Sequence, residues 1–347
     1  MRQTASHFDY STWITRLGIF FIGLFVFLIA VNFGAVDIQS ADWLHLFSQQ
    51  NGYEGASYVL WTIRIPRVLL AITVGAALGI AGALAQSLFR NPLADPGLLG
   101  VSAGASCSVA IGIVMLDGFR FIPTEELRVW AIPFFAFLGA IAVCFCLDYV
   151  ARVVSPGSIA GLLLTGIALN AFAGAVIGLC TYLANDEQLR SFTFWTLGSL
   201  ASARWLMVGV LIGALVIGWA WIRTLLQDLN ALTLGENIAN HLGVDVLRLR
   251  TKVIVLVATL SGLAVAWCGM IGFIGLMAPN LVRICLGSDQ KRVIPYSAGV
   301  GAILLVIADT IARTIAIPAE LPVGIFTALL GGPLFLILLR QYRSRLN

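Results

Sequence analysis

The chain has 347 residues, of which 59% are hydrophobic and 11% are charged, and its formal net charge at pH 7 is +4. A soluble domain carries about 25% charged residues, so this composition excludes an ordinary soluble globular protein. Segments that cross a bilayer are helices or barrel strands, and the period-two alternation of barrel strands is not visible. The composition therefore predicts an all-α, polytopic membrane protein.

Ten apolar runs follow one another along the chain, and we expect each to cross the membrane as a helix. The first, residues 14–34, follows a polar tail of residues 1–13 and is too long for the apolar core of a secretory signal. The others lie at 60–86, 96–116, 129–151, 157–184, 204–222, 249–268, 271–287, 295–312 and 322–340. An even number places both termini on one side of the membrane. No internal boundary divides the chain, so residues 1–347 are expected to form one transmembrane domain.

The distribution of lysine and arginine predicts which side holds the termini. With both termini in the cytoplasm, the outer side receives seven of the 21 basic residues: Arg64, Arg67, Arg120, Arg128, Arg190, Arg204 and Arg313. The excess on the other side favours cytoplasmic N- and C-termini. The longest cytoplasmic segment, at about 223–250, is too short for an enzymatic domain but long enough for two short helices.

The turn between the second and third runs reads RNPLADPGLLGVSAG, residues 90–104. Pro92 and Pro96 cannot continue the incoming helix, so the chain must turn there. Pro96 and Gly97 suit the start of a new helix that Asp95 would cap. Small side chains follow, and either a closely packed neighbouring helix or a wide pathway would produce them. The residues alone leave both readings open.

Catalytic and metal centres have little support in the sequence. The six cysteines lie in or beside apolar runs without a C-x-x-C motif, and the three histidines, His7, His45 and His241, lie outside the spanning runs. We therefore expect no metal site, and cysteines that act as small apolar side chains. The phosphate loop G-x-x-x-x-G-K-[ST] is absent, so we expect a chain that is not itself an enzyme.

Four long stretches, in order, closely resemble one family. They are RIPRVLLAITVGAALGIAGALAQSLFRNPLADPGLLGVSAGAS (64–106), LNALTLGENIANHLGVDVLRLR (229–250), GMIGFIGLMAPNLVRICLG (269–287) and AELPVGIFTALLGGPLFLILLR (319–340). The chain thereby resembles the permease subunits of type II ABC importers, which take up iron chelates, haem and vitamin B12. One departure is Asn280, where the family usually has a histidine after the proline.

The resemblance implies a ten-helix permease in the bacterial inner membrane, where two identical copies form a homodimer around a central pathway. It also implies two cytoplasmic ATPase subunits that bind ATP-Mg, and a periplasmic substrate-binding protein. It implies no cofactor on this chain and no nucleic acid partner. ATP hydrolysis would then take place on the separate ATPase subunits.

The resemblance further implies residues that meet the binding protein. Arg64, Arg67 and Arg313 align with arginines that receive acidic residues of that protein in similar permeases. Arginines that anchor a helix end at the membrane surface are the alternative for the first two. Asp309 lies four residues before Arg313 and offers it an internal partner.

The loop between the sixth and seventh runs fits a groove on the ATPase in this family. The matching positions are Leu234, Gly235, Glu236, His241 and Gly243. A helix lying on the membrane surface is the alternative, and the lack of lysine and arginine between residues 229 and 246 argues against it. For the translocation pathway the candidates are Ser102, Gly104 and Ser106, with packing between helices as an equal alternative.

The stretch TYLANDEQLRSFTFWTLGSLASARW, residues 181–205, resembles the haem-importing branch, whose members carry an L-x-D/N-D-x-Q-L-R-x-x-T-F-W pattern. Haem is therefore the expected ligand, with ferric siderophore or vitamin B12 as alternatives. Phe192, Phe194 and Trp195 could face a flat apolar ligand or form an interfacial aromatic belt. A secondary transporter driven by ions would need ionisable residues at mid-membrane, and the spanning runs contain almost none.

Overall fold

The computed structural model describes residues 4–34, 43, 54–115, 125–155, 158–317 and 319–346, and within these ranges the secondary structure is helical without strands. The elements in chain order are α1 (Thr4–Asn32), α3 (Glu54–Tyr58), a π-helical turn (Val59–Arg64), α4 (Ile65–Leu88), a 3-10 turn (Pro96–Leu99), α5 (Val101–Ala110), a π-helical turn (Ile111–Met115), α6 (Glu125–Val154), α7 (Ile159–Leu183), α8 (Asp186–Thr196), α9 (Trp205–Thr233), α10 (Glu236–His241), α11 (Val246–Cys268), α12 (Ile274–Leu286), α13 (Gln290–Thr314) and α14 (Val323–Leu346). Arg120 and His45 lie outside the described residues.

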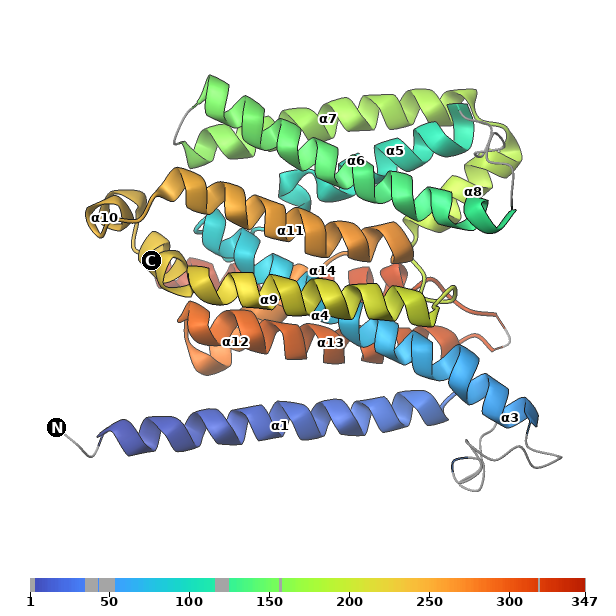
Figure 1. Ribbon diagram of the computed structural model, residues 1–347, viewed down its shortest axis with the longest axis horizontal. Helices are drawn as coiled ribbons and strands as arrows, with labels where there is room; N and C mark the ends of the chain where they lie inside the picture. The colour runs from blue at the N-terminus through green and yellow to red at the C-terminus, as the bar shows by residue number, and fades with distance from the viewer. Residues whose placement is uncertain are drawn as a thin grey trace.

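The long helices lie side by side in one bundle, with α1 along one edge (Figure 1). The central helix is α4, which contacts α9, α11, α12 and α13. Its approach to α13 is close because Gly75 lies against Gly301, and Gly79 lies against Ser297, without side chains between the backbones. Small residues that let helix backbones meet are typical of membrane bundles, where packing rather than hydrophobicity joins the helices.

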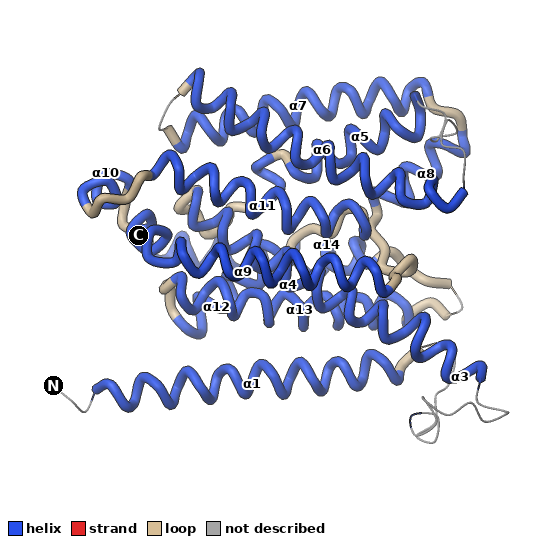
Figure 2. The backbone as a smooth tube through the Cα atoms, viewed as in Figure 1, coloured by secondary structure: helices blue, strands red, loops and turns tan. Residues whose placement is uncertain are grey.

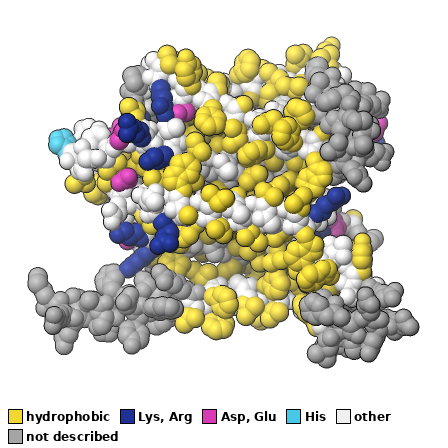
Figure 3. Space-filling model, viewed as in Figure 1, with side chains coloured by type: hydrophobic (Ala, Val, Ile, Leu, Met, Phe, Trp, Pro, Cys, Tyr) yellow, Lys and Arg dark blue, Asp and Glu magenta, His cyan; other side chains and the backbone are white. Residues whose placement is uncertain are grey.

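The two ends of the bundle carry different elements. The start of α1, the end of α14 and α10 lie at one end, called here the α10 end, and α3 and α8 lie at the other, called the α8 end (Figure 2). The two ends of the chain thus lie at the same end of the bundle, as the even number of runs predicts. Hydrophobic side chains cover the middle of the face shown in Figure 3, and most of its visible basic side chains gather at the α10 end.

Within the part of the chain that the structure describes, six helices are long and apolar enough to cross a membrane. Four shorter apolar helices match the remaining predicted runs: Leu17–Asn32, Val101–Val114, Ile274–Leu286 and Val323–Ile337. Two helices extend well beyond the predicted apolar runs. Helix α1 already begins at Thr4, within the expected tail, and α9 continues to Thr233, beyond the expected end at residue 222. Leu225, Leu229 and Leu232 stay buried and carry the packed face of α9 past the apolar run.

The helical course is interrupted between α11 and α12. Five residues separate Cys268 from Ile274, and Phe273 has a φ of 66°. The 13 residues of α12 span about 20 Å, less than the roughly 30 Å of the hydrocarbon layer. Irregular backbone at that depth must be covered by protein. Ser199 N donates to Cys268 O at 2.8 Å, and Gly198 and Gly324 lie against the Met270 carbonyl.

Candidate functional site

Three arginines lie buried at the α8 end of the bundle. Arg64 and Arg67 stand at the start of α4, on either side of Pro66, and Arg313 lies in the last turn of α13. Their exposed fractions are 4%, 6% and 6%. The neighbouring helices cover all three, and the docking role that the resemblance implies for them stays a prediction.

Two carboxylates hold Arg67. Its Nη2 lies 2.9 Å from Asp309 Oδ1, its Nε donates to both Asp309 oxygens at 3.1 Å, and its Nη1 lies 2.8 Å from Glu320 Oε2. Arg313 Nε is farther from Asp309 Oδ2, at 3.7 Å. The expected internal pair of Asp309 with Arg313 therefore exists, but Arg67 is the closer partner. Asp309 is 1% exposed, whereas the Glu320 side chain is 48% exposed.

The end of α1 closes the cluster from the other side. Arg64 Nη1 donates to Val31 O at 2.9 Å and to Asn32 O at 2.8 Å, and Arg313 Nη2 donates to Ala30 O. The last carbonyls of a helix lack intrahelical donors and carry partial negative charge, so guanidinium groups stabilise them. The three arginines can be buried because helix-end carbonyls and carboxylates replace the water that their guanidinium groups lose.

At the α10 end, one glycine shapes the loop that follows α9. Gly235 has φ 125°, a conformation that side-chain-bearing residues rarely adopt, and it directly precedes α10. The expected pair of short helices is not found in the described residues from 223 to 250. The segment contains one short helix, α10, because α9 takes up its first part and α11 begins at Val246.

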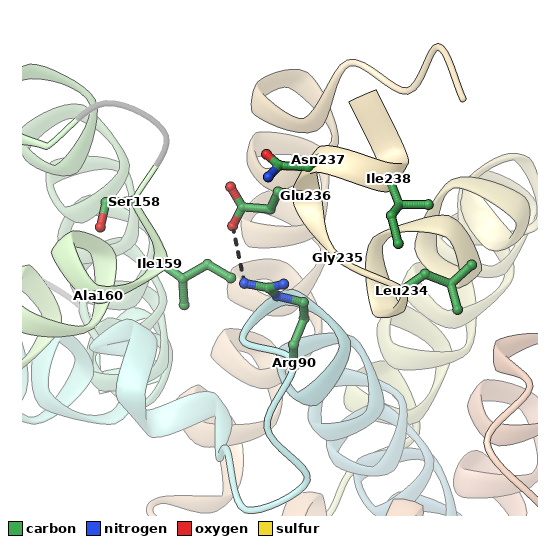
Figure 4. A pocket seen from close by; sticks show the side chains of 9 residues that line it. All are labelled: Arg90, Ser158, Ile159, Ala160, Leu234, Gly235, Glu236, Asn237 and Ile238. Carbon is green, nitrogen blue, oxygen red and sulfur yellow. Dashed lines mark ion pairs between the residues drawn. The ribbon is translucent and has the colours of Figure 1, made fainter. Parts of the chain in front are cut away.

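Glu236, one of the predicted coupling residues, turns toward the bundle. Its Oε1 lies 2.5 Å from Arg250 Nη2 and 3.7 Å from Arg90 Nη2. A cavity of about 550 Å³ borders this pair, lined from α10, from Arg90 and from the start of α7 at Ser158 (Figure 4). Glu236 thus ties α10 to α11 and to the turn after α4.

The outer surface of the loop is apolar. Leu234 and Leu242 are each 64% exposed, and Ile238 between them is also exposed. Sequence reasoning named Leu234 but missed Ile238 and Leu242, although their spacing of four residues could have revealed them. His241 is exposed, and its Nδ1 lies 2.6 Å from Asn237 O. Gly243 follows with φ 83° and ends the turn.

At the start of the 90–104 turn, Asp95 caps the following helical turn as the sequence predicts. Asp95 Oδ1 accepts from Gly97 N at 2.8 Å and caps a 3-10 turn, and Gly100, with φ 80°, then starts α5. Burial raises the pKa of the Asp95 carboxyl, and the bond from Gly97 N–H offsets part of that rise. Asn280 is 1% exposed and donates from Nδ2 to Pro92 O at 2.8 Å. The amide at the unusual position therefore fastens this turn to α12.

The three pathway candidates lie in different surroundings. Gly104 packs against Gly139 of α6, where a Cβ would overlap the Gly139 carbonyl. Ser106 is buried, and its Oγ lies 3.3 Å from Met270 Sδ. Ser102 is half-buried. The contacts of Gly104 and Ser106 are those expected of packing between helices, the alternative to a pathway role.

The aromatic residues of the 181–205 stretch do not form one surface. The stretch folds into α8, with a capping box between Asn185 and Gln188. Phe192 is buried, Trp195 is half-buried, and Phe194 is exposed. Of the three, Phe194 is the one available to a ligand or to the membrane interface.

The sequence profile of the FecCD transport family matches residues 22–341. The chain belongs to the FecCD transport family. Among curated relatives, this permease is 41% identical to the hemin transport system permease protein HmuU of Yersinia pestis, over 93% of the chain and 96% of the relative. It is 36% identical to the vitamin B12 import system permease protein BtuC of Citrobacter koseri, over 95% and 94% respectively.

A solved structure has the same fold. It is described as an inward-facing conformation of a metal-chelate type ABC transporter, and it matches the permease with a TM-score of 0.80 and 29% identity. The match covers 94% of this chain and 98% of that one. The expected type II importer permease fold is therefore confirmed.

Proposed function

We propose that this permease is the transmembrane subunit of an ATP-driven importer that carries haem across the bacterial inner membrane. The supporting observation is its 41% identity, over almost the full length of both chains, to a hemin permease. The pattern of residues 181–205, which resembles the haem-importing branch and folds into α8, supports the same ligand. Haem would arrive there from a periplasmic binding protein.

The α10 end would face the cytoplasm. The basic side chains that gather there favour this orientation, with both termini inside. The exposed side chains of Leu234, Ile238 and Leu242 give α10 an apolar surface suited to a groove on an ATPase subunit. Gly235 and Gly243 set the angle of that surface, and Glu236 couples it to the bundle. ATP-Mg would bind to two such subunits, since this chain has no phosphate loop.

A second permease copy would complete the pathway. Helix α7 supports this, because only 17% of the residues in its most apolar segment are buried within the chain. Gly174 and Gly178 also face open space, since a Cβ at either position would have no atom within 4 Å. Such a bare helix face is suited to another helix or to lipid. The proposed assembly is a homodimer.

The binding protein would dock at the α8 end. Glu320 lies at the surface with Arg67 behind it, so an incoming carboxylate meets an arginine that already holds an acidic residue. Docking at Arg64, Arg67 and Arg313 therefore requires that carboxylates of the binding protein replace or join internal partners. Electrostatic contacts of this kind govern the rate and specificity of association.

The decisive experiment is reconstitution in liposomes with the ATPase and the binding protein. We expect haem-loaded binding protein to stimulate ATP hydrolysis and haem uptake more than protein loaded with a ferric siderophore or vitamin B12. Preference for one of these other ligands would refute the haem assignment and leave the importer intact. The 36% identity to a vitamin B12 permease makes that vitamin the second candidate.

An ion-coupled transporter is the contrasting class. Among the described residues, the buried carboxylate of the spans is Asp309, and it is paired with Arg67 rather than free to carry a proton. Liposomes that contain the permease alone should therefore accumulate no haem under a proton or sodium gradient. Accumulation there would refute the ATP-driven mechanism.

A further inference from the structure

A groove of about 370 Å³ runs between α1 and the body of the bundle. Residues of α1 on one side and of α4 and α13 on the other line it, among them Gly23, Leu24, Phe27, Ile72, Ile303 and Val306. Its lining is entirely apolar side chains and glycines. Figure 1 shows α1 lying along the edge of the bundle beside these helices.

Helix α1 is held on both sides of this groove. Toward the α8 end, its last carbonyls accept from Arg64 and Arg313. Toward the α10 end, Ile19 approaches Gly299 so closely that a Cβ there would lie 2.7 Å from Ile19 Cγ2. Between these contacts lies the groove, which the side chains of α1, α4 and α13 line without filling.

The position of the groove determines what can fill it. The lining residues belong to apolar helices that we assign to the membrane, so the groove opens toward hydrocarbon. Water needs polar partners, and an apolar groove offers it none. An empty space would forfeit the dispersion contacts of its lining. A lipid acyl chain, present all around α1, restores them.

The charge at the α10 end of the groove selects a kind of lipid. Arg292 precedes Gly299 by seven residues in α13, which is two helical turns and therefore the same helix face. Arg292 also interacts within the chain, but a guanidinium has five N–H donors and can serve a phosphate as well. Basic pockets between helices on this side bind acidic head groups.

We propose that the groove binds one anionic glycerophospholipid of the bilayer, with an acyl chain between α1 and α13 and its phosphate at Arg292. The lipid completes the packing of α1, which the protein alone leaves open along the middle of the helix. This inference is independent of the transported ligand, because it uses none of the residues assigned to docking, coupling or transport.

The test measures which lipid the full-length chain retains. The protein is placed in nanodiscs of equal parts phosphatidylglycerol and phosphatidylcholine, released, and analysed by native mass spectrometry. We expect bound phosphatidylglycerol in preference to phosphatidylcholine. Gly23→Leu should abolish this retention by filling the groove. The control is Gly18→Leu, on the same helix where nothing lies within 4 Å, and it should retain the lipid.

The head-group contact has its own pair of variants. Arg292→Gln should remove the preference for phosphatidylglycerol, whereas Lys291→Gln, the neighbouring and exposed cation, should keep it. A photo-crosslinker at Leu24 should label lipid in the otherwise unchanged chain, which covers the case that Gly23→Leu fails to fold. The proposal is overturned if Gly23→Leu folds and retains the lipid, if both arginine and lysine variants behave alike, or if Leu24 labels no lipid.

Discussion

The buried ion pair between Arg67 and Asp309 allows a quantitative test of the arginine cluster. Asp309→Asn keeps the size of the side chain and removes its charge. Three donor–acceptor contacts of 2.9–3.1 Å join Arg67 to the Asp309 oxygens, and both side chains are at most 7% exposed. Removing one partner of such a buried pair costs about 3–5 kcal/mol, because Arg67 and Arg313 then lose their buried counter-charge and Arg67 keeps only the half-exposed Glu320.

Glu320→Gln is the matched control. It removes the other carboxylate that contacts Arg67, at 2.8 Å, but the Glu320 side chain is 48% exposed. Water screens this pair, so its loss should cost less than about 1 kcal/mol. The two variants delete the same charge against the same arginine and differ in burial. The structure therefore predicts a large difference in stability between them.

Thermal unfolding in detergent, followed with a thiol-reactive fluorophore, measures this difference. Cys146 and Cys285 are exposed and give a constant signal, whereas Cys144, Cys180 and Cys268 are free and buried and add to it only when the bundle opens. The unfolding midpoint of Asp309→Asn should fall well below that of Glu320→Gln, which should stay close to the unsubstituted protein. Equal midpoints for the two variants would refute the assignment of Asp309 as the charge that compensates the buried arginines.

Three further predictions concern docking, coupling and pH. Glu320→Gln should strengthen binding of an acidic binding protein up to about fivefold, measured as the Kd on nanodiscs, because one surface carboxylate no longer competes for Arg67; weaker binding would contradict this. Reversing Arg67 to glutamate is a poorer test, since three carboxylates would then meet and disturb the fold. Gly235→Val should keep ATP hydrolysis and lose haem uptake, because φ 125° strains any side chain by about 1–3 kcal/mol, whereas Gly209→Ala in α9 should keep both activities. The raised pKa of Asp95 stabilises the fold most below the unfolded value of about 4, and that stabilisation is lost as pH rises through the folded pKa; Asp95→Asn should flatten the pH dependence of the unfolding midpoint, and an unchanged profile would count against the buried carboxyl.

The number and order of the helices could be predicted because apolar runs and their polar breaks report directly on membrane spans. Boundaries set by packing could not. The end of α9 depends on Leu225, Leu229 and Leu232, which continue a buried face beyond the apolar run at 204–222. The apolar runs also place a break between residues 268 and 271, but they do not show that it extends to Phe273, because the residues there are as apolar as the helices on either side.

The candidate sites were predictable by position and less so by environment. The sequence placed Arg64, Arg67 and Arg313 at helix ends, but it could not show that α1 covers them, since that contact joins residues far apart in the chain. Likewise, Asn280 could be recognised as unusual without revealing Pro92 as its partner. Long-range contacts decide both cases, and a single sequence does not report them.

The interruption before α12 has a mechanical consequence. Three chain segments meet there backbone to backbone, since Gly198 after α8 and Gly324 in α14 both abut the Met270 carbonyl. No flexible side chain separates them that could absorb a displacement. A tilt of α14 therefore displaces α8 and α12 with it as one rigid unit. In this way a movement inside the bundle reaches α8 at the surface.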